Sequence, residues 1–288
     1  MKKIFSAILV LLILICFAGC GRSPVEIPRE DTEGENQSPE PSPEQVSIAE
    51  EVVIDEQGIR IQIAALEEAR MGPELKVQIE NSSEVSVTVQ VRKTSVNGFM
   101  IEPIFSCDVA PGKKAVDGIS FYESDMERHN IEVITNIELV FHVFNATTWE
   151  TVFRSQPVQI ITTAADKHSQ TYDSAGDVLI ESAGIKIVFQ GLSEDYLGPV
   201  AKLYIENNTD EFVSVQAKDT SVNGFMISPV FSCEITPGKK VIDGLSFYED
   251  DIAEHGIDAI QEIELRFIIF NPDSWKTILE TEYITITP

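Results

Sequence analysis

The sequence predicts an all-β protein made of two tandem immunoglobulin-like antiparallel β-sandwiches, each with one short helix. First, residues 52–162 align without a gap with the second half of the chain, and nearly half of the aligned positions are identical. Second, apolar and polar residues alternate with a period of two, as in strands with one buried face. Third, Gly-Pro, Asn-Gly, Pro-Gly and Asp-Gly turns separate seven to nine short strands per repeat, a spacing typical of immunoglobulin-like sandwiches.

The internal repeat defines the domain organisation. Its longest identical string, TSVNGFMI, occurs at Thr94–Ile101 and again at Thr220–Ile227, an offset of 220 − 94 = 126 residues. Because so long a period exceeds that of solenoid repeats, it predicts two self-sufficient domains, at 51–162 and 177–288. The polar segment 163–176 between them is expected to be a flexible joint.

The strands of the first repeat are predicted from alternation, which the second repeat reproduces. The apolar positions that carry the pattern are Ile59, Ile61, Ile63, Leu75, Val77, Ile79, Val85, Val87, Val89, Val91, Ile119, Phe121, Ile137, Leu139, Phe141, Val143, Val158 and Ile160. A short helix is expected near Ser124–His129, where Ser124 and Glu127 have the spacing of a capping box. In the second repeat Asp250 is the expected helix cap.

The N-terminal segment predicts export. Two lysines precede an apolar run that ends at Phe17 and is too short for a comfortable membrane span, so residues 1–19 are interpreted as a secretion signal. The run ends in Phe17-Ala18-Gly19-Cys20, which resembles the lipobox of bacterial lipoproteins. The resemblance implies a diacylglyceryl thioether on Cys20 and a membrane anchor of palmitate-type acyl chains. An uncleaved short anchor and a plain secretory signal are the alternatives.

Residues 20–50 are predicted to be a disordered tether after the lipidated cysteine. Between positions 21 and 50 the chain has five prolines, eight acidic residues and almost no large apolar side chain. Such a segment cannot bury enough apolar surface to offset the entropy of ordering. Its proline-rich, like-charged composition favours an extended chain that holds the folded part away from the bilayer.

Charge and cysteine content restrict the function further. The 47 acidic against 21 basic residues give a net charge of −26, which disfavours nucleic acid as a partner. Cys107 and Cys233, one per repeat, cannot form a bridge within a domain, and each is interpreted as a small buried hydrophobe rather than a reactive thiol or half of an inter-repeat bridge. No nucleophile, metalloprotease, phosphate-binding or dinucleotide motif is present, so we expect no enzyme activity and no cofactor.

The combination of a lipobox, an acidic stalk and tandem β-domains containing SVNGF and PGKK resembles Gram-positive surface lipoproteins with immunoglobulin-like repeats. This resemblance implies an extracytoplasmic, lipid-anchored protein on the bacterial cell surface. It implies no activity and no catalytic residue.

One candidate binding loop occurs in each repeat: Asn97, Gly98, Phe99 and Met100, repeated as Asn223, Gly224, Phe225 and Met226. Asn-Gly between strands predicts a type I′ hairpin turn, in which both central residues have positive φ. Loops on sandwiches also carry binding sites, and the Phe and Met would then be the contact residues.

A metal hypothesis concerns acidic residues and one histidine near each predicted helix: Asp117, Glu123, Asp125 and His129, repeated as Asp243, Glu249, Asp251 and His255. Calcium requires six to eight oxygen ligands, and no matching loop is present. Acidic residues in a first helical turn also complement the helix dipole. Capping and solvated charge are therefore preferred, and no metal is expected.

Trp149 and Trp275 occupy a strand connection in each repeat. They are expected to pack at the edge of the sandwich, and an exposed platform for sugar rings is the alternative. The paired lysines after each Pro-Gly, at 113–114 and 239–240, are expected to be the solvated edge of a turn.

The sequence favours a binding or adhesion module of the envelope, with a glycan or a protein as ligand. The alternatives are a passive structural spacer, an accessory subunit of an envelope complex and, with less support, a hydrolase. Duplication slightly favours binding, because two tethered copies raise avidity.

Overall fold

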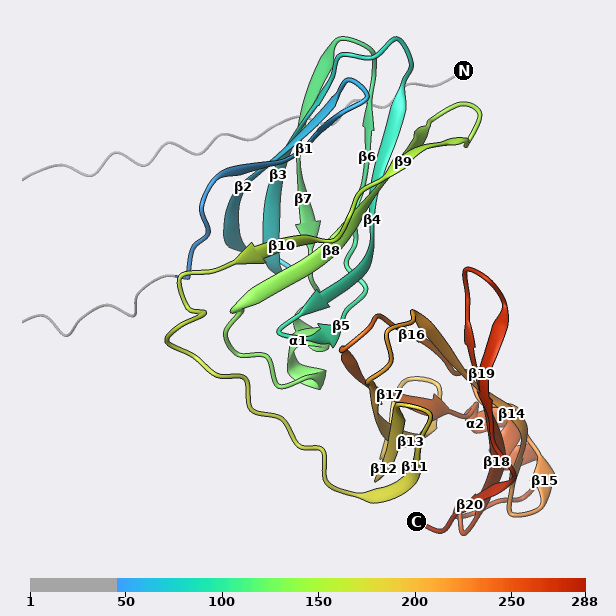
Figure 1. Cartoon of the computed structure of the whole chain (residues 1–288). Coiled ribbons are helices and arrows are strands. Elements are labelled where there is room, and N and C mark those ends of the chain that lie inside the picture. The colour runs from blue at the N-terminus through green and yellow to red at the C-terminus, as the bar shows by residue number, and fades with distance from the viewer. Residues whose placement is uncertain (1–45) are drawn as a thin grey trace, which may run out of the picture. The chain divides into compact units, whose positions relative to one another are not determined.

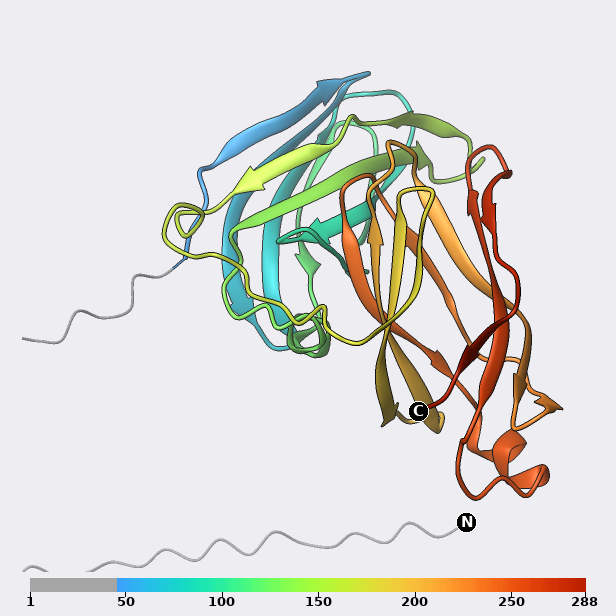
Figure 2. The ribbon, with the colours of Figure 1, turned by 60° about the horizontal axis from the view of Figure 1, so that its bottom comes forward.

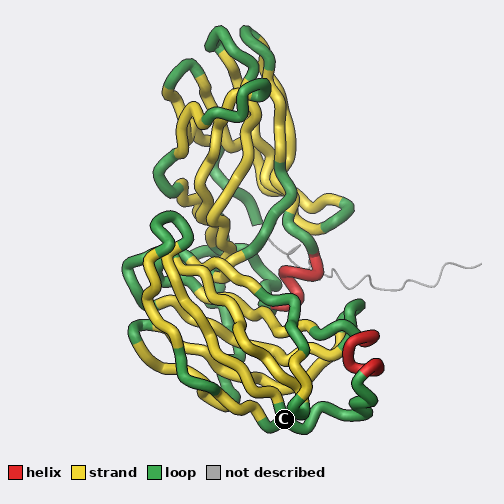
Figure 3. Tube along the Cα trace, turned by 90° about the vertical axis from the view of Figure 1, so that its right-hand side faces the viewer, coloured by secondary structure: helices red, strands yellow, loops and turns green. Residues whose placement is uncertain are grey.

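The computed structural model describes residues 46–288, and Gln45–Pro288 form one compact unit. The predicted signal segment, Cys20 and nearly all of the predicted tether lie outside the described residues. The described chain is all-β, as predicted, with two short helices (Figure 1; helices red in Figure 3). None of its helices is long and apolar enough to cross a bilayer.

The first repeat contains ten strands and one helix, which exceeds the predicted seven to nine strands. In chain order they are β1 (Glu51–Glu56), β2 (Ile59–Ala69), β3 (Gly72–Asn81), β4 (Val87–Val96), β5 (Phe99–Met100), β6 (Ser106–Val109), β7 (Lys113–Ser120), α1 (Glu123–Arg128), β8 (Asn136–Asn145), β9 (Thr151–Arg154) and β10 (Val158–Ile161). The difference arises because β5 has only two residues and the C-terminal part divides into two short strands.

The second repeat has the same element order. It contains β11 (Asp177–Ser182), β12 (Ile185–Glu194), β13 (Pro199–Asn207), β14 (Val213–Val222), β15 (Phe225–Met226), β16 (Ser232–Ile235), β17 (Lys240–Ser246), α2 (Glu249–Glu254), β18 (Ile263–Asn271), β19 (Lys276–Glu280) and β20 (Ile284–Ile286). Each repeat is an immunoglobulin-like sandwich of two antiparallel sheets. The described chain thus consists of two tandem sandwiches.

In each repeat a four-stranded sheet faces a six-stranded one. The first repeat has the order β1-β2-β3-β7 in one sheet, and the other contains β4, β5, β6, β8, β9 and β10. The corresponding four-stranded sheet of the second repeat, β11-β12-β13-β17, joins the six-stranded sheet of the first through β5 and β17. The result is a single ten-stranded sheet shared by both repeats.

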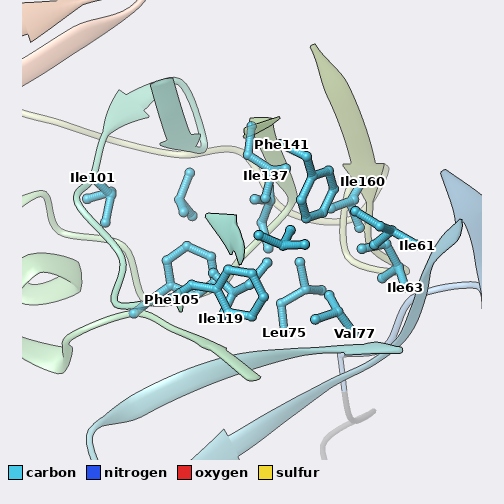
Figure 4. Close-up of a cluster of buried hydrophobic side chains, with 14 of the residues drawn as sticks. Ile61, Ile63, Leu75, Val77, Ile101, Phe105, Ile119, Ile137, Phe141 and Ile160 are labelled. Atoms are coloured by element: carbon cyan, nitrogen blue, oxygen red, sulfur yellow. The ribbon is translucent and has the colours of Figure 1, made fainter. Parts of the chain in front are cut away.

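The core of the first repeat lies between its two sheets. Figure 4 shows Ile137 and Phe141, from β8, opposite Leu75 and Val77, from β3, and all four side chains are buried. The predicted alternation therefore selects the inward positions correctly here. Val85 is an exception: it is 42% exposed, because the chain between β3 and β4 forms a loop before the strand begins.

A buried asparagine closes that loop in each repeat. The Nδ2 of Asn81 donates to the carbonyls of Val85 and Val109, both at 2.8 Å, while its Oδ1 accepts hydrogen bonds from the backbone and hydroxyl of Ser83. Asn207 makes the same four bonds at the equivalent place. Every polar atom of both amides is thus paired inside the protein, which fixes the loop to the β6 or β16 strand end.

The predicted helix caps are wrong in both repeats. The N-cap residues are Tyr122 and Tyr248, neither of which makes a side-chain cap bond. Ser124 and Asp250 lie inside the first helical turn instead. The cause is tertiary: the Glu123 N–H donates to the carbonyl of Met71 at 2.8 Å, which fixes where the chain turns into α1.

The segment predicted to be a flexible joint, residues 163–176, makes specific contacts along its length (yellow-green between β10 and β11 in Figure 2). Its Gln170 donates hydrogen bonds to the carbonyls of Asn130 and Thr171, and its Tyr172 ring lies 5.5 Å from that of Phe99. At its start, Thr163 bonds Ser47, so the described end of the predicted tether pairs with the folded unit.

Candidate functional site

The Asn-Gly turns have the predicted backbone geometry. The φ angles are +50° and +82° at Asn97 and Gly98, and +49° and +84° at Asn223 and Gly224. Both central residues of each turn thus occupy the left-handed region that a type I′ hairpin requires. Two-residue strands follow the turns, β5 after the first and β15 after the second, and pair with the ends of β4 and β14.

The asparagine of each turn also holds the long segment that follows the helix. Asn97 donates to the carbonyl of Val133 at 2.8 Å and accepts from the backbone N–H of Thr135 at 2.8 Å. In the second repeat, Asn223 donates to the carbonyl of Ala259 and accepts from the N–H groups of Gln261 and Glu262. The turn and the segment after the helix therefore form one surface in both repeats.

The aromatic residue after the turn has opposite environments in the two copies. Phe99 is fully buried, whereas Phe225 is 46% exposed and Met226 is 69% exposed. Each phenylalanine ring contacts the histidine at the end of its helix, at 5.1 Å from His129 and 5.0 Å from His255. The local structure is the same, so the difference in burial comes from additional neighbours of Phe99.

Those neighbours come from the linker and the second repeat. The backbone N–H of Lys240, the first residue of β17, donates to the carbonyl of Gly98 at 3.0 Å, which makes a parallel bridge to β5. The Lys240 ammonium lies 3.7 Å from the centre of the Tyr172 ring and 5.2 Å from that of Phe99. Strand β17 and the linker thus cover the turn of the first repeat, and a backbone hydrogen bond and cation–π contacts hold them there.

The paired lysines of the second repeat are therefore part of the contact between the two repeats around Phe99, which is called the joint from here on. The Lys239 ammonium pairs with Glu138 of the first repeat at 3.2 Å, and both side chains are 18% exposed. The expectation of a solvated edge holds for Lys114, which is 64% exposed and pairs with Glu80 within its own repeat. For Lys239 and Lys240 that expectation is wrong, because the other repeat covers them.

Sequence reasoning missed the apolar surface that completes the joint. Val188, Tyr204 and Ile242 are cross-strand neighbours on β12, β13 and β17, and they belong to the buried cluster of the first repeat. Tyr204 is fully buried although its neighbours Leu203 and Ile205 fill the core of its own repeat. A signal for this surface exists at two of these positions, where the first repeat has Gln62 and Gln78 instead of Val188 and Tyr204; the third is apolar in both repeats, with Val116 in the first.

The uncovered turn of the second repeat is bordered by acidic residues. Residues 249–262, which Asn223 and Phe225 contact, contain six carboxylates and no lysine or arginine: Glu249, Asp250, Asp251, Glu254, Asp258 and Glu262. The equivalent segment of the first repeat contains Arg128 and fewer acids. The second turn thus presents an apolar pair of side chains beside an acidic segment.

The buried histidine of the first site is held in its neutral form. His129 is 2% exposed, its Nδ1 contacts the carbonyl of Asp125 at 2.8 Å, and its Nε2 has no hydrogen-bond partner. Burial lowers the pKa of His129 to about 4, an effect only partly opposed by that carbonyl. Protonation would place an unpaired positive N–H inside the protein, away from water, which explains the direction of the pKa shift.

We expect this histidine to make the free energy of unfolding pH-dependent. As the pH falls from about 7 to 4, the unfolded chain takes up a proton before the folded chain does, so stability decreases over this window. A displacement from 6.5 to about 4 corresponds to about 3 kcal/mol at about 1.4 kcal/mol per pKa unit. In His129→Gln, denaturation measured at pH 7 and pH 4.5 should show a smaller loss than in the unaltered chain.

An unchanged loss in His129→Gln would contradict this assignment. The free energy of unfolding of the variant still depends on pH between about 7 and 4, because burial also lowers the pKa of His142.

The residues of the metal hypothesis are not brought together as a coordination site. Within residues 46–288, no group of three or more His, Cys, Asp or Glu side chains is placed to hold a metal ion. Asp117 accepts a hydrogen bond from the N–H of Gly118, and Asp243 does the same with Gly244. These carboxylates thus bond their own strands rather than facing a common point.

Two clefts of the described residues bear on the candidate sites. The first, of about 630 Å³, lies beside α1 and includes Glu123 and Met126 in its wall. The second, of about 1280 Å³, is lined by Arg92 and Arg154 of the first repeat and Asp273 of the second. Of the predicted site residues, Glu123 alone lines either cleft.

The two tryptophans are exposed, contrary to the expected packing at the sandwich edge. Trp149 and Trp275 are 74% and 77% exposed, with one ring face stacked on Phe144 and Phe270 at 5.6 and 5.5 Å. The phenylalanine holds each indole in place while its other face meets solvent. The arrangement retains the alternative of a platform for sugar rings.

The cysteine interpretation is confirmed. Cys107 and Cys233 are both free and buried. Burial raises the pKa of the Cys107 thiol to about 11, with the nearby Asp117 adding to the effect, and burial raises that of Cys233 well above its usual range. Both thiols therefore act as core side chains.

Comparison with known proteins relates the chain to solved structures, among them the three below. No family model and no curated sequence matches it. The YadV chaperone has 12% identity and a TM-score of 0.25, with 80% of this chain and 100% of that chain covered. The Salmonella enterica SafA pilin–SafB chaperone complex has 12% identity, a TM-score of 0.20 and coverage of 75% and 89%.

A third structure is the CsuC–CsuE chaperone–tip adhesion subunit complex of Acinetobacter baumannii. It has 14% identity and a TM-score of 0.22, with 74% of this chain and 91% of that chain covered. Similarities at this level assign no function to the chain.

Proposed function

We propose that this chain is a lipid-anchored extracytoplasmic binding protein whose second repeat presents the Asn223–Met226 turn to a protein partner. One observation carries the proposal: the same turn is buried against a β-strand in the first repeat and exposed in the second. The first copy illustrates how such a turn is covered, and the second has the same backbone and side chains.

The physical basis is the cost of exposing Phe225 and Met226 to water. Each apolar side chain gains about 1.5–3 kcal/mol when it is fully buried, and aromatic side chains are frequent anchors of protein interfaces. Their backbone is rigid, because Asn223 bonds three groups of the neighbouring segment. A preorganised apolar pair loses little entropy on binding.

The anchoring part of the proposal rests on the sequence alone. The lipobox-like Phe17–Cys20 and the acidic, proline-rich residues up to position 50 support an anchor and a spacer, which would place the folded unit outside the membrane. Labelling of growing cells with a radioactive fatty acid is expected to mark the intact chain and to fail with Cys20→Ala. Label retained in that variant would contradict the anchor.

The binding role is tested by capture from envelope extracts with soluble residues 45–288. We expect Phe225→Ser/Met226→Ser to lose a captured protein that the unaltered chain retains. The control is Trp149→Ala/Trp275→Ala, which removes equally exposed aromatic surface elsewhere. Equal capture by all three proteins, each with an unchanged unfolding transition, would contradict a role for the turn.

A second candidate function, glycan binding, is favoured by the exposed tryptophans. Both indoles project one free face at the same position of each repeat, and sugar rings stack on such faces. In that case the tryptophan variant would lose binding to envelope polysaccharide while the turn variant retained it. The same pair of variants thus separates the two candidates.

A further inference from the structure

We propose that the partner segment that docks on the exposed turn is a lysine-bearing edge strand of another protein. This inference rests on the proposed function and specifies its ligand: a strand with a free edge, whose N–H bonds the carbonyl of Gly224 and whose lysine ammonium lies over Phe225. The proposal follows from the joint inside the chain, from the charge around the turn and from the sequence differences between the repeats.

The joint of the first repeat supplies the geometry. There, β17 pairs with β13 on one edge and offers its other edge to Phe99, and the Lys240 N–H donates to the carbonyl of Gly98 at 3.0 Å. The Lys240 side chain crosses the apolar surface and places its ammonium 5.2 Å from the Phe99 ring centre. In the second repeat, the carbonyl of Gly224 and the ring of Phe225 are the equivalents of the Gly98 carbonyl and the Phe99 ring in this contact.

Charge complementarity indicates that the missing strand is basic. The segment 249–262, which contacts the turn through Asn223 and Phe225, carries six carboxylates and no lysine or arginine, so a cationic strand is attracted and an acidic one is repelled. An anionic lipid surface is disfavoured for the same reason. In the first repeat Lys239, the residue just before the docked strand β17, likewise pairs with an acidic residue of the other repeat, Glu138.

A second copy of this chain is a poorer occupant. Its strand β7 is the edge strand equivalent to β17, and it has Lys114 where β17 has Lys240. However, the apolar Val188 and Tyr204 that complete the joint are replaced there by Gln62 and Gln78. Two chains of net charge −26 also repel each other, whereas a basic partner would not.

The test uses residues 45–288 and a defined probe, the ten-residue peptide PGKKVIDGLS of positions 237–246, which includes the strand that covers Phe99 in the intact chain. The matched control peptide has glutamate at both lysine positions. NMR titration is expected to shift the Met226 methyl and Phe225 ring signals with the lysine peptide. The glutamate peptide should bind at least about fivefold more weakly, from loss of the cation–π contact and added repulsion.

The protein control is Phe225→Ser/Met226→Ser, which removes side chains that lie outside the buried core, at 46% and 69% exposed, and should fold normally. Its remaining signals should not respond to the lysine peptide. No shift in the unaltered chain, or equal shifts with both peptides, would overturn the assignment of a lysine-bearing strand. Capture of a protein through the turn in envelope extracts would then still support the proposed function, so the two failures are distinguishable.

The last measurement tests whether the chain self-associates through the turn. Sedimentation velocity of residues 45–288 is expected to show a monomer over micromolar to hundred-micromolar concentrations. A concentration-dependent oligomer that disappears in Phe225→Ser/Met226→Ser would overturn the proposal and assign the turn to a second copy of the chain.

Discussion

Replacement of Phe99 by alanine is expected to lower the free energy of unfolding by about 3–5 kcal/mol, the usual cost of removing a buried aromatic ring. The ring is fully buried and contacts His129, Tyr172 and Lys240, so its loss leaves a cavity bordered by both repeats and the linker. Denaturant unfolding of residues 45–288, followed by near-ultraviolet circular dichroism, measures the change.

The matched control is Phe225→Ala, the same substitution at the equivalent position of the second repeat. With Phe225 46% exposed and in contact with His255 alone among aromatic rings, we expect a loss of less than about 1 kcal/mol. Equal losses in the two variants would show that the joint does not cover Phe99 in solution. The proposed role of the second turn would lose its structural basis at the same time.

The second large effect is expected at Asn81. In Asn81→Ala the carbonyls of Val85 and Val109 lose the Nδ2 donor and Ser83 loses the Oδ1 acceptor, although the Ser83 hydroxyl still donates to the Val85 carbonyl at 3.2 Å; each buried unpaired group costs about 1–3 kcal/mol. We therefore expect a loss of about 2–5 kcal/mol in the free energy of unfolding, measured in the same way. Asn207→Ala should cost as much, because it makes the same four bonds.

Asn208→Ala is the control for this pair, since Asn208 is the exposed neighbour of Asn207. Its replacement should change the free energy of unfolding by less than about 0.5 kcal/mol. A comparable loss in Asn208→Ala would show that the effect reflects the loop conformation rather than the buried amide.

The sequence predicts the fold well because the fold depends on local patterns repeated many times. Alternation identifies the inward residues of β2, β3 and β8, and the Asn-Gly pair identifies a turn whose two φ angles are positive. These features depend on the period of the side chains and on backbone sterics within a few residues. A second copy with the same pattern adds confirmation from within the same chain.

Features that depend on distant residues could not be predicted in this way. The helix starts were misplaced because a carbonyl some 50 residues earlier in the chain, that of Met71 for Glu123, fixes the first turn more strongly than a local capping box. The candidate site shows the same effect more clearly. Phe99 and Phe225 lie in the same eight-residue string, yet one is buried and the other is not.

A comparison of the repeats at non-identical positions could have found the joint. Tyr204 and Val188 occupy outward positions on their strands, where alternation predicts polar residues such as Gln78 and Gln62 of the other copy. When only one copy has apolar residues at outward positions, these residues indicate a surface of that copy that packs against another part of the molecule. The contrast between copies thus predicts interfaces that the pattern within one copy does not.

The buried turn of the first repeat also determines the valency of the molecule. A duplicated domain would be expected to offer two equivalent binding surfaces and thereby gain avidity. Here one of the two turns is occupied by the chain's own strand β17, so the described residues expose a single copy. A partner that recognises the turn would bind with a stoichiometry of one per chain. Any avidity would then come from the density of chains on a surface rather than from the duplication within each chain.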